Sequence, residues 1–196
     1  MKKDPLAAEL PTLPFATPRA FSDWLVDHHA TSRGLWLQLA KKASGTASIT
    51  YAEAVDVALA WGWIDGQKQR ADEASWLQKF TPRRAKSVWS KINREKVLSL
   101  IEAGAMQPAG LAEVERAKKD GRWDAAYDPP SRATVPEDLQ AALAKNAKAA
   151  AFFLTLKASN RFAVLWRVQA AKKPETRQKR IAEFVAMLAR GETPRP

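Results

Sequence analysis

The segment from Thr50 to Gly66 constrains the fold more than any other part of this chain. Thr50 and Glu53 form a capping box, in which the threonine hydroxyl accepts the N3 amide and the glutamate carboxylate accepts the N-cap amide. Apolar residues then recur on one helical face, and Gly62 ends the helix. The aromatic residue that follows Gly62 favours a strand. An amphipathic helix that leads directly into a β-strand is therefore predicted.

Three strands are predicted in all. Leu35, Leu37 and Leu39 alternate with Trp36, Gln38 and Ala40, which indicates a strand with both faces at least partly covered. Residues 63–70 and 75–80 are predicted to pair as two strands around the turn at 71–73. A first helix is expected over 22–29. Residues 1–18 carry four prolines and are expected to form an irregular lead-in.

After Pro82 the pattern is helical. Ser87 or Ser90 is expected to cap a helix that ends at Gly104, and a second helix is expected over 111–119. Asp128-Pro129-Pro130-Ser131 is predicted to be a linker. Beyond it, an alanine-rich region is predicted to be wholly helical between Glu137 and Arg190, with Pro136 at the first helical position and helices over 159–171 and 174–190. The fold class is α+β: a small antiparallel sheet with helices over 1–128, then an all-helical region over 129–196.

Composition excludes several kinds of chemistry. The 196 residues include no cysteine, which rules out disulfides, thiolate catalysis and sulfur-ligated metals. The two histidines are the neighbours His28 and His29, which point about 100° apart on a helix and do not chelate one ion easily, so we expect no metal site. No glycine-rich phosphate loop occurs, and we expect no cofactor. No apolar segment is long enough to span a bilayer and no signal peptide is recognisable, so the cytoplasm is the expected location.

A basic cluster follows the predicted hairpin. Residues 67–98 contain nine Lys or Arg against three acids, which is +6 of the chain's net charge of +11. A surface this basic, beside Trp and Ser, indicates a site for an anion. Hydroxyls and free amides at a helix start, next to arginines, would bind an anion without a cofactor. The expected site residues are Trp63, Asp65, Arg83, Arg84, Lys86, Ser87, Trp89 and Ser90, converging in one pocket or shallow cleft.

Each of these residues also has a plainer explanation. Asp65 is expected to pair with Arg83 or Arg84 and fix the turn, rather than to act as a general base. Ser87 and Ser90 would simply cap a helix, because no nucleophile motif surrounds them. The tryptophans are more often core residues than a stacking platform. We therefore assign no catalytic residue.

Several motifs, in this order, resemble the YdeI/OmpD-associated family, also called bacteriocin-protection proteins. They are Leu35-Trp36-Leu37, the loop Lys41 to Gly45, Tyr51-x-Glu53-Ala54-Val55, Gly62-Trp63-Ile64-Asp65-Gly66, Thr81-Pro82-Arg83-Arg84, Ser87-x-Trp89-Ser90, Ala117-Lys118-x-x-Gly121-Arg122-Trp123 and Thr176-Arg177-x-x-Arg180-Ile181. The resemblance extends from about Phe21 to Leu188, and Trp61 departs from it. It implies a YjbR/CyaY-like N-terminal domain, a helical C-terminal region, a bacterial role in envelope stress and antimicrobial-peptide tolerance, and association with a porin.

These observations favour a non-enzymatic binding protein of the bacterial stress response with a basic, Trp-lined, anion-recognising surface. Its expected partners are a small anionic ligand or an envelope protein such as a porin, without membrane insertion. One alternative is an enzyme that acts on a small anionic substrate with Asp65 as general base. Another is non-specific nucleic-acid binding, which we expect to be weak or absent because 21 acids are interspersed among the 32 bases. A closed polar site around Asp65 would favour the enzyme, and an open basic face with an exposed tryptophan would favour nucleic acid.

Overall fold

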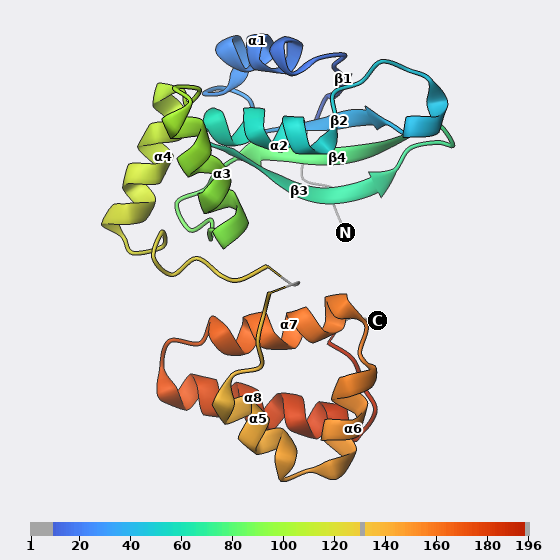
Figure 1. The fold of residues 1–196 in the computed structure, drawn as a ribbon, viewed down its shortest axis with the longest axis vertical. Helices are drawn as coiled ribbons and strands as arrows, with labels where there is room; N and C mark the ends of the chain where they lie inside the picture. Colours follow the sequence, from blue (N-terminus) through green and yellow to red (C-terminus); the bar gives the residue numbers. More distant parts are fainter. Residues whose placement is uncertain (1–9, 130–131, 195–196) are drawn as a thin grey trace, which may run out of the picture. The chain divides into compact units, whose positions relative to one another are not determined.

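The computed structural model describes residues 10–129 and 132–194. It contains two compact units, which are described separately below (Figure 1). The first unit comprises the described residues through Trp89 together with 93–126, and the second comprises 90–92 and the described residues from Tyr127 onward. Pro130 and Ser131 of the predicted linker, and the first half of the predicted lead-in, lie outside the described residues. Among the described residues, no helix is both long and apolar enough to cross a bilayer.

The first unit is built on a four-stranded mixed sheet in the order β1-β2-β4-β3. The strands are β1 (Thr12–Pro14), β2 (Leu35–Ala40), β3 (Trp63–Arg70) and β4 (Ser75–Pro82). β2 and β3 occupy their predicted ranges, and β4 extends two residues further than predicted. The expectation of a purely antiparallel sheet is wrong, because β1 forms within the predicted lead-in and pairs with β2 in parallel. The amide of Trp36 also bonds the Pro11 carbonyl, so backbone pairing holds this proline-rich segment to the sheet.

One face of the sheet is buried under two helices, α1 (Pro18–His28) and α2 (Tyr51–Ala60). Leu35, Leu37 and Phe80 are fully buried on this face. Phe80 meets Phe21 of α1 edge-to-face at 5.8 Å. The predicted capping box of α2 is present: the Thr50 amide donates to Glu53 and the Glu53 amide donates to the Thr50 hydroxyl. Because strand residues alternate between faces, Trp36 and Lys79 point to the opposite face, which α1 and α2 do not cover.

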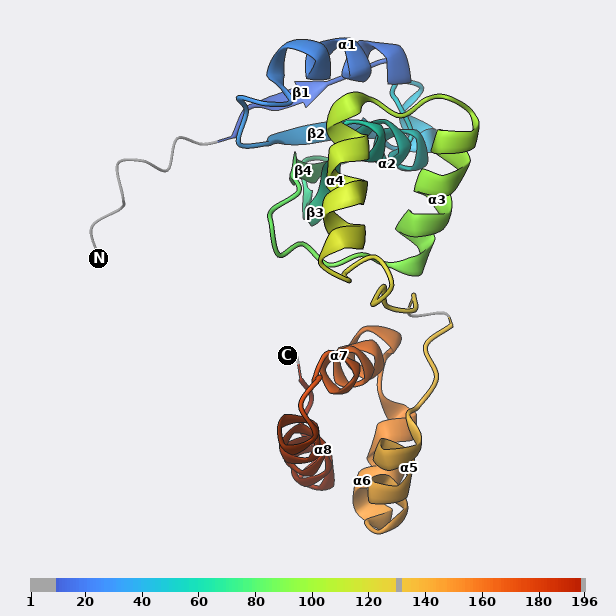
Figure 2. The same ribbon diagram turned by 90° about the vertical axis from the view of Figure 1, so that its left-hand side faces the viewer.

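Two further helices, α3 (Lys91–Glu102) and α4 (Pro108–Lys119), follow the sheet (Figure 2). α4 packs closely on the end of α2 at Gly110. A β-carbon added at Gly110 would lie 2.1 Å from the carbonyl oxygen of Ala60, so only glycine fits there. The same Ala60 carbonyl accepts the amide of Gln107, which fixes the start of α4.

The second unit is helical, and the described residues 132–194 contain no strand, which confirms that part of the prediction. Its helices are α5 (Glu137–Ala144), α6 (Ala147–Thr155), α7 (Ala158–Gln169) and α8 (Pro174–Ala189). Pro136 is the N-cap of α5 rather than its first residue. Asp138 of α5 holds Arg177 of α8 through two hydrogen bonds, one of them 2.8 Å from Nη2 to Oδ1. This pair ties the first helix of the unit to its last.

Candidate anion-binding cleft

The structure places the two predicted tryptophans in the core. Trp63 is 1% exposed and Trp89 is 2% exposed. The Trp63 indole donates to the His29 carbonyl at 3.2 Å, and Trp89 packs edge-to-face on Trp123 at 5.0 Å. The expectation that these side chains form the wall of an open binding surface is therefore wrong. The burial of these two large side chains removes their apolar surface from water and stabilises the core.

Arg83 is also buried, with 5% of its surface exposed. Its guanidinium lies 3.5 Å from the ring centroid of Trp89, and its Nη1 donates to the Val88 carbonyl at 3.2 Å. Its backbone amide donates to the Gly62 carbonyl. A planar cation over an indole is favourable when both are shielded from water. Arg83 therefore holds the segment after β4 against the core.

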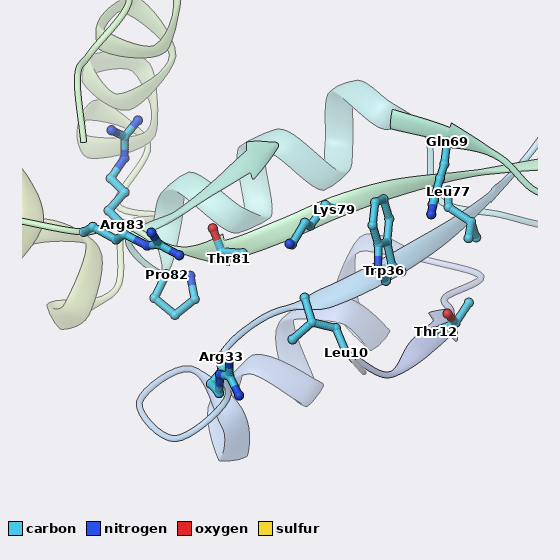
Figure 3. A pocket seen from close by; sticks show the side chains of 11 residues that line it. Leu10, Thr12, Arg33, Trp36, Gln69, Leu77, Lys79, Thr81, Pro82 and Arg83 are labelled. Atoms are coloured by element: carbon cyan, nitrogen blue, oxygen red, sulfur yellow. The ribbon is translucent and has the colours of Figure 1, made fainter. Parts of the chain in front are cut away.

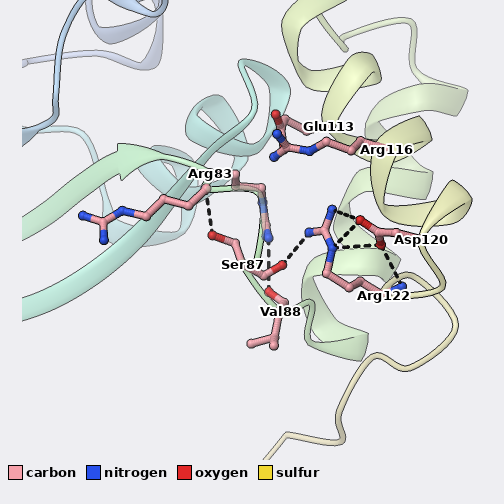
Figure 4. A network of polar contacts seen from close by, with 8 residues as sticks. Arg83, Ser87, Val88, Glu113, Arg116, Asp120 and Arg122 are labelled. Atoms are coloured by element: carbon pink, nitrogen blue, oxygen red, sulfur yellow. Dashed lines mark hydrogen bonds and ion pairs between the residues drawn. The ribbon is translucent and has the colours of Figure 1, made fainter.

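A polar network fixes that segment, residues 83–89 (Figure 4). The Arg84 amide donates to the Ser87 hydroxyl at 2.9 Å, and the Ser87 amide donates back to the Arg84 carbonyl at 2.9 Å. Arg122, which pairs with Asp120, donates to the Ser87 carbonyl at 2.7 Å. Ser87 thus closes a turn with Arg84 and does not cap α3, which begins only at Lys91, so the expected helix cap is wrong for this residue. The side chains of Arg84 and Lys86 are exposed.

Asp65 and Ser90 are held elsewhere. The Tyr51 hydroxyl of α2 donates to Asp65 Oδ2 at 2.7 Å, on the helix-covered face of the sheet. Among the described residues, Asp65 therefore bonds to the Tyr51 hydroxyl and does not form the expected ion pair with Arg83 or Arg84. Ser90 belongs to the second unit, where it bridges to Tyr127. The residues expected to converge in one cleft therefore do not all lie together.

A cleft of about 720 Å³ lies on the other face of the sheet (Figure 3). This volume is within the range of about 300–1,000 Å³ that is typical of small-molecule sites. Four of the eleven lining residues are positively charged and none is acidic. The lining comprises Leu10, Thr12, Arg33, Trp36, Gln69, Leu77, Lys79, Thr81, Pro82, Arg83 and Arg84. Of the predicted site residues, Arg83 and Arg84 belong to this cleft.

The sheet register positions the middle of the cleft. Thr12 of β1 pairs with Trp36 of β2, and Trp36 pairs with Lys79 of β4, so the three side chains lie side by side across three strands. The Lys79 ammonium lies 5.7 Å from the centroid of the Trp36 ring. Among the described residues, neither Lys79 nor Arg84 has a carboxylate within salt-bridge distance. Their charges are therefore available to attract an anion.

Arg33, Trp36 and Lys79 line the cleft but are not among the residues expected from the sequence. Trp36 was recognised as part of a strand and Lys79 as part of the basic cluster. The alternation that buries Leu35, Leu37 and Phe80 sends Trp36 and Lys79 to the opposite face. Only the pairing of β2 with β4, which the sequence does not reveal, brings these two residues together.

The sheet with its cationic cleft, followed by a helical unit, defines a two-unit α+β protein. Residues 13–113 match the family described as "Domain of unknown function (DUF8412)", and the chain belongs to this family. Residues 132–191 match the family described as "Bacteriocin-protection, YdeI or OmpD-Associated". The likeness to the latter thus covers the helical unit rather than the whole span from 21 to 188. No curated protein and no solved structure matches the chain.

Proposed function

We propose that the protein is a non-enzymatic binding protein whose first unit binds an anionic ligand in the cleft over β2 and β4. The observation that carries this proposal is the lining itself, with four positive residues and no acid. Lys79 and Arg84 supply charge at the surface, whereas the Arg83 guanidinium is held against Trp89 and the Val88 carbonyl. An anion bound here exchanges water for charge-assisted hydrogen bonds in a concave site.

The enzymatic alternative has less support. The residue expected to act as its general base, Asp65, does not line the cleft and is bonded to Tyr51 instead. The lining contains no His, Asp or Glu, which act most often as general acids and bases, and no Cys nucleophile. Ligand binding without catalysis is therefore better supported for this cleft than an enzymatic reaction.

The wider role that we propose is protection against envelope stress such as bacteriocins. It is supported by the match of residues 132–191 to the bacteriocin-protection family. A YjbR/CyaY-like fold for the first unit and a porin as partner remain proposals that rest on the resemblance alone. A net charge of +11 disfavours direct capture of cationic peptides. We therefore propose that protection depends on anion binding in the cleft and not on direct binding of the bacteriocin.

Isothermal titration calorimetry with inorganic pyrophosphate at about 150 mM salt tests the binding step. The double variant Lys79→Gln, Arg84→Gln should lose at least tenfold in affinity, because each charge-assisted bond contributes about 1.5–3 kcal/mol. The control Lys172→Gln, Lys179→Gln removes the same charge from exposed positions of the helical unit. Equal affinities for both double variants would show that net charge, and not the cleft, attracts the anion.

A bacteriocin survival assay tests the wider role. In a strain that lacks the gene, wild-type protein should restore tolerance and the cleft double variant should not, with both present at equal amounts. The control double variant should restore tolerance fully. Full protection by the cleft variant would separate protection from anion binding and contradict the proposed link.

A further inference from the structure

We infer that the anion which the cleft accepts is a nucleoside phosphate, with its phosphate at the arginine end and its base against Trp36. This inference rests on the proposed anion-binding function and specifies its ligand. It depends on an uneven distribution of chemistry along the cleft. One end is cationic, and beyond Lys79 the aromatic ring of Trp36 leads to neutral hydrogen-bonding side chains at the other end.

The two ends are separated along β4. Thr81 and Pro82 lead into Arg84 at one end, whereas Leu77 lies at the other end beside Gln69, its pairing partner on β3. Thr81 lies four steps along the extended strand from Leu77, which is about 13 Å at about 3.3 Å per step. Figure 3 shows Arg33 and Pro82 toward one end of the cleft and Thr12, Gln69 and Leu77 toward the other. This length accommodates a phosphate, a sugar and a base in line.

The cationic end suits a phosphate. Arg33 and Arg84 are exposed and lie on separate loops, after α1 and after β4. Guanidinium groups match phosphate oxygens through paired N–H donors. Lys79 stands between this end and Trp36, since its ammonium lies 5.7 Å from the ring. A phosphate bound near Lys79 therefore brings whatever is attached to it against the indole.

The opposite end suits a base rather than an acyl chain. Trp36 offers an indole, half-buried and fixed by its strand, and indoles stack on bases of any sequence. Thr12 and Gln69 are exposed and both donate and accept hydrogen bonds, as base edges and sugar hydroxyls require. Seven of the eleven lining side chains are polar or charged. This is more polarity than a hydrocarbon tail tolerates without losing hydrogen bonds to water.

Calorimetry with four probes tests the inference: AMP, ribose 5-phosphate, inorganic pyrophosphate and a six-residue oligothymidylate. AMP should bind at least tenfold more tightly than ribose 5-phosphate, because base stacking on an aromatic side chain is of that order. Trp36→Leu should remove this preference and leave pyrophosphate binding intact. The control Trp166→Leu, at a half-buried tryptophan of the helical unit, should leave the preference unchanged.

The outcomes separate the two claims. Equal binding of AMP and ribose 5-phosphate, with pyrophosphate bound, would overturn the nucleotide inference and leave anion binding in place. Failure of all four probes would overturn both. If the oligonucleotide binds much more tightly than AMP, the ligand is a single-stranded nucleic acid. If the two bind with similar affinity, the ligand is a free nucleotide.

An NMR titration tests the inference if Trp36→Leu does not fold. AMP should then shift the indole resonance of Trp36 in the wild-type protein and leave the indole resonance of Trp166 unchanged. The opposite pattern would overturn the inference.

Discussion

Arg83 illustrates how a residue from a basic cluster becomes part of the core. The sequence places it among nine positive residues, yet the structure buries it against Trp89. A charge that is this buried is stable only when its environment compensates for lost hydration. Stacking on the indole and the bond to the Val88 carbonyl provide that compensation. The position is therefore suited to a planar guanidinium rather than to a generic positive charge.

The variant Arg83→Lys should lower the free energy of unfolding by about 1–3 kcal/mol, since an ammonium neither stacks on Trp89 nor reaches Val88 in the same geometry. Urea denaturation measures the change. The neighbouring variant Arg84→Lys is the control, because the Arg84 side chain is exposed and its substitution should change stability by less than about 0.5 kcal/mol. Similar losses for both would show that burial at residue 83 does not matter.

Asp65 has a smaller structural role than the predicted ion pair would give it. Its bond to Tyr51 lies at the surface, where Tyr51 is 42% exposed. Because an asparagine oxygen still accepts the phenol proton, Asp65→Asn should cost less than about 1 kcal/mol. A double-mutant cycle with Tyr51→Phe should give a coupling energy of about 0.5–1 kcal/mol. A coupling near zero would show that the bond does not contribute to folding.

At the scale of elements, the close contact between α2 and α4 depends on the glycine at position 110, which has no β-carbon. Gly110→Ala would place a β-carbon 2.1 Å from the Ala60 carbonyl oxygen, so the two helices must separate. We expect a loss of about 1–3 kcal/mol, which is typical of overpacking. Thermal unfolding measures it. Gly66→Ala is the matched control, because its added β-carbon would meet atoms at ordinary distances of 3.7 Å or more. An unchanged melting temperature for Gly110→Ala would contradict the close contact.

The helical unit should lose part of its stability in acid. Bonding to Arg177 lowers the pKa of Asp138 below its usual value. A lowered folded-state pKa contributes stability that is complete above the unfolded-state pKa of about 4 and is lost as the pH falls through the folded-state value. Because both side chains are partly exposed, the contribution should stay below about 1 kcal/mol.

Calorimetric unfolding of the wild type and Arg177→Gln, at pH 6 and at pH 2, measures this contribution. The difference between the two proteins should shrink at pH 2. Arg180→Gln is the control, because Arg180 donates to the Arg167 carbonyl and should show a difference that does not depend on pH. A gap between the wild type and Arg177→Gln that is the same at both pH values would contradict the role of Asp138.

For the whole molecule, local signals predicted most of the fold. The capping box at Thr50 and Glu53 and the alternation over 35–40 each identify an element without reference to the rest of the chain. β1 was not predicted, because three residues of a proline-rich segment form a strand only when β2 is available to pair with them. The parallel pairing of β1 was missed for the same reason.

The candidate site was predicted less well than the fold. Basic composition drew attention to Arg84, which lines the cleft, but clustering in sequence does not state which side chains are buried. Trp63 and Trp89 became core residues because they pack against α1 and Trp123. Trp36 and Lys79 meet only through the register between β2 and β4. Register depends on long-range pairing, so a cleft assembled across strands is invisible to a search for local motifs.

The central claim is that anions bind in the cleft between Arg84 and Gln69, and NMR titration tests it most directly. Inorganic pyrophosphate added to ¹⁵N-labelled protein at about 150 mM salt should shift the amides of Lys79, Thr81 and Arg84 and that of Trp36, which pairs with Lys79. Amides of the exposed basic face at 172–180 serve as the internal comparison. Shifts concentrated on the sheet residues are the predicted result. Shifts spread evenly over both basic regions, or confined to 172–180, would contradict the account.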